Sequence, residues 1–313
     1  MSIVMPVKNG MQYLEASKHQ LSCNASPCDQ IVVVDDGSTD GSTDFLKFWA
    51  SSDERVTYLR NRGVGIVSAL NFGIRESAHQ WIARFDVDDL YVEDRIDVQM
   101  RCIEPGDVAI FSDFNIISEN QKPLGRVLAA VEPSAVAVSL INRQRIAHPS
   151  SIFNKQAALE VGGYREKDVF VEDLSLWLRL LKSGNLRTVP QALMQYRIHQ
   201  NSISVMNRSR MINAGRAIID SIGISSDYFE ATKLNLAQIF SSYEKYQTPR
   251  DREFLLIRDL YTFSKYANLD MSGIRLELEH YSHFVQYPSS LIKLTFQSLR
   301  RRNYRKSFSN PKS

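Results

Sequence analysis

The chain has 313 residues, of which 43% are hydrophobic and 23% charged, and its formal net charge is +3. These values exclude collagen-like, low-complexity and wholly disordered proteins, and the length predicts two domains or one large domain with an added lobe. Three cysteines without paired spacing predict reduced thiols rather than a zinc site. Neither a secretory signal nor a membrane-spanning helix is expected.

Short β-branched runs alternate with helical patterns between residues 2 and 90. Strands are expected at residues 3–5, 31–34, 56–59 and 81–85, with helices at 11–22 and 64–77. This alternation predicts βαβ units and a mostly parallel sheet. In such sheets ligands bind at the carboxyl ends of the strands.

The second half of the chain has longer helical patterns. Strands are expected at residues 108–111, 152–153 and 192–197, and helices at 174–181, 212–222, 234–246 and 254–266. Gly184 is a candidate stop for the helix over 174–181. We therefore expect an α/β domain over residues 1–205 and a helical region with a basic tail over residues 206–313.

Two acidic clusters follow predicted strands. The first, at residues 35–40, is typical of a solvated turn or a calcium loop, but Lys47 stands where an EF-hand needs glutamate. The second contains Asp86, Asp88 and Asp89. Carboxylates at the end of a strand suit Mg²⁺ or Mn²⁺ that is also held by substrate phosphates, although such a pair alone is a weak signal.

Seven motifs, taken in order, give the sequence a specific resemblance. They are Pro6 with Asn9; Val34-Asp35-Asp36-Gly37-Ser38; Gly65 with Ala69-Leu70-Asn71; Ala83-Arg84 with Asp86 and Asp88-Asp89; Val161-Gly162-Gly163-Tyr164; Glu172-Asp173 before Leu176; and Tyr196-Arg197 with His199. This order resembles the family 2 glycosyltransferases, which are inverting enzymes of the GT-A fold. That α/β fold has a Rossmann-like, mostly parallel sheet. The resemblance covers residues 2–205 and says nothing of residues 206–313.

The resemblance implies a UDP-sugar donor. The donor-binding residues that it implies are Pro6, Val7, Asn9, Asp36, Arg60, Arg62, Asn71, Arg84 and Asp86. Uracil presents an imide N–H that a carboxylate can accept, whereas cytosine presents a lone pair, and the resemblance assigns this contact to Asp36. The alternative interpretation of Asp36 is that its side chain caps the following turn. The alternative for Arg60 and Arg62 is that they are exposed side chains with no ligand.

The same resemblance implies a divalent metal, Mn²⁺ or Mg²⁺. Asp88 is expected to hold the metal between the two donor phosphates, while Asp86 meets the ribose. His199 is expected to contact the metal or the pyrophosphate, with an exposed loop histidine as the alternative. If the strand alternates, Arg84 points away from its neighbours and braces the carboxylates.

Transfer with inversion needs a base opposite the leaving group. Asp173 is the expected base, with Glu172 and His148 on the acceptor side. The alternative for this acidic pair is structural, because acids at a helix N-terminus are favoured by the helix dipole.

The sequence therefore predicts an inverting, metal-dependent glycosyltransferase that moves a sugar from a UDP-sugar to a glycan or lipid-linked acceptor. Bacterial surface polysaccharide or lipopolysaccharide synthesis is the expected setting. One alternative is a sugar-phosphate nucleotidyltransferase, whose Gly-rich phosphate loop is missing at residues 6–9. The other alternative is a non-catalytic scaffold lobe of a glycan assembly complex.

The C-terminal segment is strongly basic. Seven basic residues and no acidic residue follow Glu279, so the rest of the chain has a net charge of −4. Apolar residues at near-helical spacing over 291–299 precede Arg300-Arg301-Arg302. This pattern predicts a cytoplasmic enzyme held peripherally on the anionic inner-membrane surface, with a last core helix or a solvated tail as alternatives. No nucleic-acid partner is expected, because no reading motif accompanies the charge.

Overall fold

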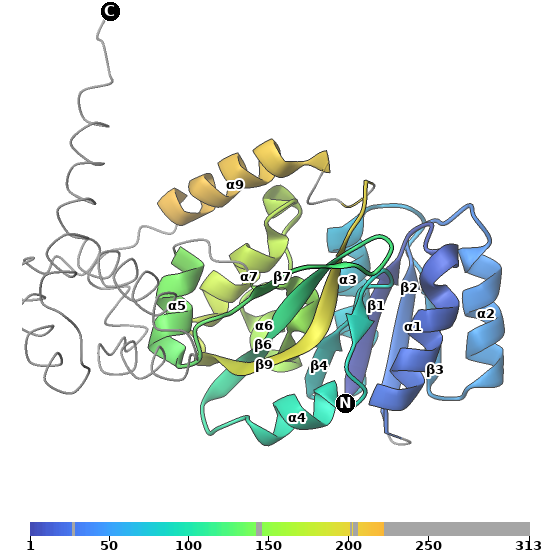
Figure 1. Ribbon diagram of the computed structural model, residues 1–313, viewed down its shortest axis with the longest axis horizontal. Helices are drawn as coiled ribbons and strands as arrows, with labels where there is room; N and C mark the ends of the chain where they lie inside the picture. Colours follow the sequence, from blue (N-terminus) through green and yellow to red (C-terminus); the bar gives the residue numbers. More distant parts are fainter. Residues whose placement is uncertain (27–28, 142–145, 201, 203–205, 222–313) are drawn as a thin grey trace, which may run out of the picture.

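The computed structural model describes residues 1–221 apart from 27–28, 142–145, 201 and 203–205 (Figure 1). Its elements are β1 (Ser2–Val7), α1 (Met11–Asn24), β2 (Gln30–Asp35), α2 (Ser42–Ser52), β3 (Val56–Arg60), α3 (Ile66–Glu76), β4 (Trp81–Arg84), β5 (Leu90–Tyr91), α4 (Arg95–Arg101), β6 (Asp107–Ser118), β7 (Pro123–Val127), α5 (Pro133–Ile141), β8 (Ile152–Asn154), α6 (Lys155–Glu160), α7 (Glu172–Leu180), β9 (Asn185–Ile198) and α9 (Arg208–Ser221). Short 3-10 turns lie at His148–Ser150 and Glu166–Asp168. Within these described ranges, no helix combines the length and apolarity needed to cross a bilayer.

One mixed sheet organises the molecule, with strand order β3-β2-β1-β4-β8-β6-β9-β5 and β7 paired to β6. The strands β3, β2, β1 and β4 are mutually parallel, and Val4 is in register with Val32 on one side and with Arg84 on the other. β8 is antiparallel to both β4 and β6, whereas β6 and β9 form a long parallel pair. The predicted α/β class with a mostly parallel first half is confirmed.

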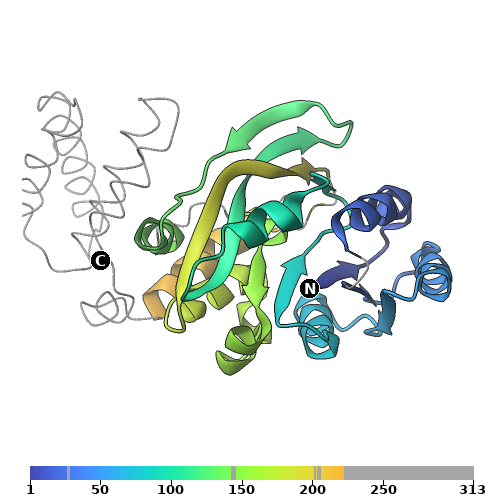
Figure 2. The same cartoon turned by 90° about the horizontal axis from the view of Figure 1, so that it is seen from below.

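The alternation of side chains along β1 and β2 divides the core into two layers. Val4 and Val32 pack with α3 on one face of the sheet, while Ile3 and Val33 pack with α1 and α2 on the other face. Figure 2 shows α1 and α3 on opposite sides of these strands. Fully apolar β-branched strands are the pattern of a sheet buried on both faces.

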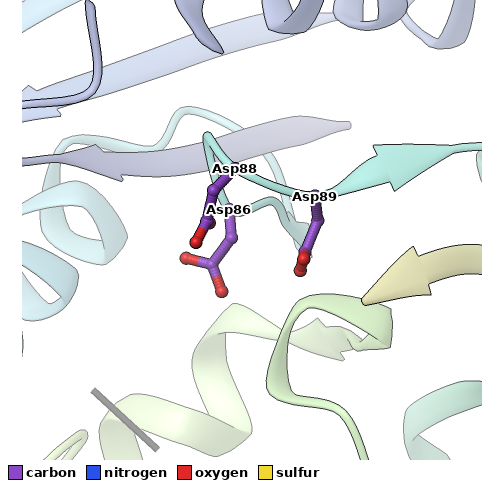
Figure 3. Close-up of side chains that lie close together, drawn as sticks. All are labelled: Asp86, Asp88 and Asp89. Carbon is purple, nitrogen blue, oxygen red and sulfur yellow. The ribbon is translucent and has the colours of Figure 1, made fainter. Parts of the chain in front are cut away.

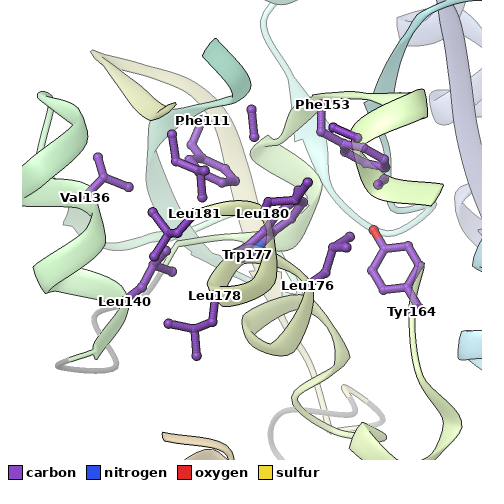
Figure 4. Packing of buried hydrophobic residues seen from close by; sticks show 14 of the residues in the cluster. Phe111, Val136, Leu140, Phe153, Tyr164, Leu176, Trp177, Leu178, Leu180 and Leu181 are labelled. Carbon is purple, nitrogen blue, oxygen red and sulfur yellow. The ribbon is translucent and has the colours of Figure 1, made fainter. Parts of the chain in front are cut away.

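Aromatic side chains in the same core layer as α3 fix α7 against the sheet (Figure 4). Trp177 is 1% exposed, and its ring meets Phe111 edge-on with the ring centroids 5.0 Å apart. Phe153 and His148 also approach this ring, at 5.7 and 5.9 Å. Aromatic pairs prefer such edge-to-face contacts. The first turn of α7, which carries Glu172 and Asp173, is therefore rigidly placed.

Several elements differ from the sequence-based expectations. Helices α2 and α5 were not expected. The apolar face of α2, with Phe45, Leu46 and Trp49, was overlooked beside the acidic cluster. All nine residues of α5 are buried, so α5 has no polar face to reveal a helical period. The strands expected at 108–111 and 192–197 extend to twelve and fourteen residues because they pair with each other. Helix α7 ends at Leu180, and the N–H of Gly184 donates to the carbonyl of Leu180.

Helix α9 corresponds to the helix expected at residues 212–222. It begins three residues after the predicted domain boundary, and its Ile218 and Ile219 pack against the core of the preceding domain. The boundary at residue 205 stays a prediction. The helices expected at 234–246 and 254–266, and the basic tail, lie outside the described residues.

Candidate active site

The carboxyl ends of β1 to β4 lie along one edge of the sheet, and the motif residues follow them. The loops after β1, β2 and β4 carry Asn9, Asp36 and Asp86. The backbone N–H of Asp36 donates to the carbonyl of Val7 at 2.8 Å, which joins the first two loops. This edge is where parallel α/β sheets bind ligands.

Asp36 is buried, with 4% of its surface exposed. Its Oδ1 accepts hydrogen bonds from the Asn61 side-chain amide at 2.7 Å and from the Gly65 backbone N–H at 3.1 Å. Its Oδ2 lies 3.5 Å from Nζ of Lys8, whose side chain is 55% exposed. One carboxylate oxygen is thus held by the protein, while the other faces an exposed lysine at the long limit of a hydrogen bond.

The neighbouring Asp35 has a structural position. Its Oδ1 accepts from the Ser38 backbone N–H at 2.8 Å, and its Oδ2 accepts from Thr43 Oγ1 at 2.6 Å and from the Tyr58 hydroxyl at 3.3 Å. These donors satisfy both oxygens of Asp35. Of these two adjacent carboxylates, Asp36 is therefore the one with free acceptor capacity at the edge of the sheet.

Five of the other residues predicted to bind the nucleotide lie in or just after β1 and β3, the strands that flank β2 and Asp36. Pro6 and Val7 are buried within β1, whereas Arg60 and Arg62 are exposed at the end of β3 and just beyond it. Asn9 is exposed and adopts φ of 53°, and its Oδ1 accepts a backbone N–H from the loop after β2 at 2.8 Å. The structure gathers these residues at one place, and their contacts with a donor stay predictions.

Three carboxylates converge after β4 (Figure 3). One oxygen each from Asp86, Asp88 and Asp89 lies within 4.8 Å of the others. Asp89 is 3% exposed, and its Oδ2 has no hydrogen-bond partner although it is buried. Burial, followed by the charges of Asp88 and Asp86, raises the pKa of Asp89 well above its usual value. Hard oxygen donors and an unpartnered buried oxygen fit a divalent cation such as Mg²⁺ or Mn²⁺.

Residues at the end of β9 and just after it form hydrogen bonds with this acidic triad. Arg197 donates its backbone N–H to Asp89 Oδ1 at 2.8 Å and its Nε to the carbonyl of Asp88 at 2.6 Å. His199 Nε2 lies 2.9 Å from Asp88 Oδ2. The predicted metal residues Asp88 and His199 are thus brought together across 111 positions of the chain.

Arg84 links the triad to the centre of the domain. Its side chain is 3% exposed and forms an ion pair with Asp86 at 2.7 Å. It also donates a hydrogen bond to the carbonyl of Phe85. A buried guanidinium needs such charged and carbonyl partners, so the geometry is that of a brace for Asp86.

The acidic pair lies in the first turn of α7. Asp173 Oδ1 accepts the backbone N–H of Leu174 at 2.7 Å, and burial raises the pKa of Asp173. Burial, followed by the charge of Asp173, raises the pKa of Glu172 to about 7, and one of its carboxylate oxygens is buried without a partner. The charge of Arg84 opposes the rise of the pKa in both groups, but its effect is smaller than that of burial. Carboxyl groups with raised pKa values are suited to proton transfer near neutral pH.

Tyr164 contacts the remaining two predicted residues, Asn71 and His148. The Asn71 side chain accepts the Tyr164 N–H at 2.9 Å and donates to the Tyr164 carbonyl at 2.8 Å. His148 Nε2 lies 2.7 Å from the Tyr164 hydroxyl, and burial lowers the pKa of His148 well below its usual value, which keeps the ring neutral. These contacts anchor the loop before α7. Donor binding by Asn71 and acceptor contact by His148 stay predictions.

Four residues that shape the site had received no role of their own in the sequence analysis. They are Asn61, Asp89, Tyr164 and Arg197. Three of them stand inside the quoted motifs, which was the available signal, whereas Asn61 stands outside every motif. Its contact with Asp36 depends on how two loops pack, and no local pattern encodes that.

A model of glycosyl transferase family 2 matches residues 2–154. This part of the chain is therefore similar to that family. A Bacillus subtilis protein named for teichuronic acid biosynthesis, the glycosyltransferase TuaG, is 27% identical over 65% of this chain and 81% of its own length. An uncharacterized glycosyltransferase of Rickettsia bellii is 26% identical over 67% of this chain, which spans only 30% of that relative.

Two solved structures show the same fold. The mannosyltransferase PcManGT of Pyrobaculum calidifontis, in complex with GDP-Man and Mn²⁺, has a TM-score of 0.57 at 15% identity, covering 95% of this chain and 83% of its own. TarS of S. aureus, residues 1–349 in complex with UDP-GlcNAc, has a TM-score of 0.55 at 13% identity, covering 90% and 77%. The predicted GT-A fold and the predicted resemblance to family 2 glycosyltransferases are confirmed.

Proposed function

We propose that the chain is an inverting, metal-dependent glycosyltransferase that moves a sugar from a UDP-sugar to a hydroxyl of a glycan or lipid-linked acceptor. We place it in bacterial surface-polysaccharide synthesis. The observation that carries the proposal is the acidic triad that follows β4, which lies at the same edge of the sheet as the buried carboxylate of Asp36. The names of TuaG and of the TarS complex with UDP-GlcNAc support this setting and donor class.

Asp36 is the residue that we assign to the uracil. Its Oδ2 is free to accept the imide N–H once the exposed Lys8 side chain moves aside. The other oxygen of this buried carboxylate already accepts two hydrogen bonds. Oδ2 therefore accepts the hydrogen bond from the imide N–H in a defined direction. Pro6 and Val7 line the base from β1, and Arg60 and Arg62 lie at the rim for the base or the phosphates.

The acidic triad is the proposed metal site. Asp88 would hold Mn²⁺ or Mg²⁺ together with the donor phosphates, with His199 beside it and Asp86 toward the ribose. A divalent ion there would supply positive charge to offset the negative charge on the departing UDP. The complex of PcManGT with Mn²⁺ supports this choice of ion.

Asp173 is the proposed general base. It takes the proton from the acceptor hydroxyl as that oxygen bonds to the anomeric carbon and the bond from this carbon to the UDP oxygen breaks. Attack from the side opposite the leaving group inverts the anomeric centre. The raised pKa of Asp173 makes it a better base than an exposed aspartate. Glu172, with a pKa of about 7, stands beside it on the acceptor side.

Substitution of Asp36 tests the donor assignment. We expect Asp36→Asn to weaken UDP binding and to lower the preference for UDP over CDP by about tenfold, because an amide can offer a donor or an acceptor to the base. Calorimetry with UDP, CDP and GDP in the presence of Mn²⁺ measures the preference. An unchanged ratio of UDP to CDP affinity would show that Asp36 does not recognise the base. Stronger binding of GDP than of UDP would show that the donor base is guanine and not uracil.

The basic tail is proposed as a membrane contact on sequence grounds, since it lies outside the described residues. Each Lys or Arg near an anionic bilayer contributes about 1 kcal/mol, so the run from Arg300 onward can hold the enzyme near a lipid-linked acceptor. We expect the full chain to float with anionic vesicles at low salt. A chain ending at Tyr287 should remain in the bottom fraction of the gradient. Equal flotation of both chains, or of neither, would show that the tail is not the anchor.

A further inference from the structure

The side chain of Asp36 is held from one side by the loop that follows β3. Both hydrogen bonds to Oδ1 come from this loop, one from the Asn61 amide and one from the Gly65 N–H. An oxygen with two donors has used its acceptor capacity. Recognition of a ligand by Asp36 therefore falls to Oδ2.

Asn61 is itself fixed in one orientation. It is 8% exposed, and its Oδ1 accepts the Ser68 hydroxyl at 2.9 Å. Its Nδ2 faces two acceptors, Asp36 Oδ1 at 2.7 Å and the Gly65 carbonyl at 3.4 Å. Because a flipped amide would point its oxygen at both acceptors, Ser68 and Asp36 together select the observed orientation.

The loop has little room to rearrange. Arg62, Gly63 and Gly65 all adopt positive φ, at 56°, 78° and 115°. A Cβ atom added to Gly37, the residue after Asp36, would lie 2.9 Å from the backbone nitrogen of Gly63. This is closer than real Cβ atoms come to backbone. The two loops are thus packed backbone to backbone around Asp36.

We propose that Asn61, oriented by Ser68, is a positioning residue for base recognition. By occupying Oδ1 it prevents the Asp36 carboxylate from turning, so that Oδ2 is presented to the imide N–H of the donor base. The preference for a uracil nucleotide then depends on a residue that does not touch the nucleotide. This inference rests on the proposed role of Asp36 in reading the base.

The test compares nucleotide preference in three variants. In Asn61→Leu, which keeps the approximate size but removes the donor, the ratio of UDP to CDP affinity should fall by on the order of tenfold. In Ser68→Ala it should fall severalfold, because the amide is free to flip, and Ser68→Thr should restore it by returning the hydroxyl. Calorimetry with UDP and CDP in the presence of Mn²⁺ gives both affinities.

Val64→Ala is the matched control, since Val64 lies in the same loop and is 65% exposed. It should keep the wild-type ratio. If Asp36→Asn loses the preference while Asn61→Leu and Ser68→Ala keep it, the positioning role is wrong and the role of Asp36 stands. If Asp36→Asn also keeps the preference, the base-reading proposal itself fails. Should Asn61→Leu not fold, the pair Ser68→Ala and Ser68→Thr decides the question.

Discussion

We expect Asp173→Asn to bind UDP-sugar as tightly as the parent protein and to lose transfer by a factor on the order of 10² or more, the usual contribution of a positioned general base. The amide keeps the shape of the side chain and can still accept the Leu174 N–H. It cannot take a proton from the acceptor hydroxyl. Binding is measured by calorimetry and transfer by the release of UDP in the presence of acceptor.

Glu166→Gln is the control for this variant, because Glu166 is an exposed acid in the turn that precedes α7. It should transfer at the parent rate. Near-parent turnover of Asp173→Asn on the true acceptor would place the base elsewhere. Loss of donor binding in Asp173→Asn would show instead that Asp173 supports the donor site.

The second large effect is expected for Asp88→Ala, which should abolish Mn²⁺-dependent binding of UDP and leave the fold intact. The remaining carboxylates offer too few oxygen ligands to hold a divalent ion against the pyrophosphate. The fold should survive because the Asp88 side chain is 28% exposed and its hydrogen bond is to His199, near the end of β9. Calorimetry of UDP with and without Mn²⁺ measures the effect, and the melting temperature reports the fold.

Asp97→Ala, on the exposed face of α4, provides the control for a lost carboxylate and should bind UDP normally. Wild-type affinity in Asp88→Ala would remove Asp88 from the metal site. Equal UDP affinity with and without Mn²⁺ in the parent protein would contradict the whole metal assignment.

The first half of the fold could be predicted from local sequence because its signals are local. Runs such as Ile31–Val34 are apolar at every position, and they form strands buried on both faces. Ligands bind at the carboxyl ends of parallel strands, and this rule places Asp36 and Asp86 at one edge from their sequence positions alone. The acidic pair of α7 was predicted from the family resemblance, because its position at a helix start fits a structural role equally well.

The remaining features depend on contacts between distant segments. Arg197 meets Asp88 and Asp89 across more than a hundred positions, and Asn61 meets Asp36 across 25. No periodicity or local motif encodes such a contact. The lengths of β6 and β9 likewise reflect their pairing with each other rather than the propensity of either segment.

The central claim is transfer from a UDP-sugar with the help of a divalent metal, and donor turnover tests it most directly. The full chain is incubated with a panel of UDP-sugars, and with GDP-mannose for comparison, in the presence of Mn²⁺ or of EDTA, and the released nucleotide is followed. We predict release of UDP from one UDP-sugar in preference to the others, which stops with EDTA and is strongly reduced in Asp88→Ala. Release that persists in EDTA and in Asp88→Ala, or release from GDP-mannose alone, would contradict the claim.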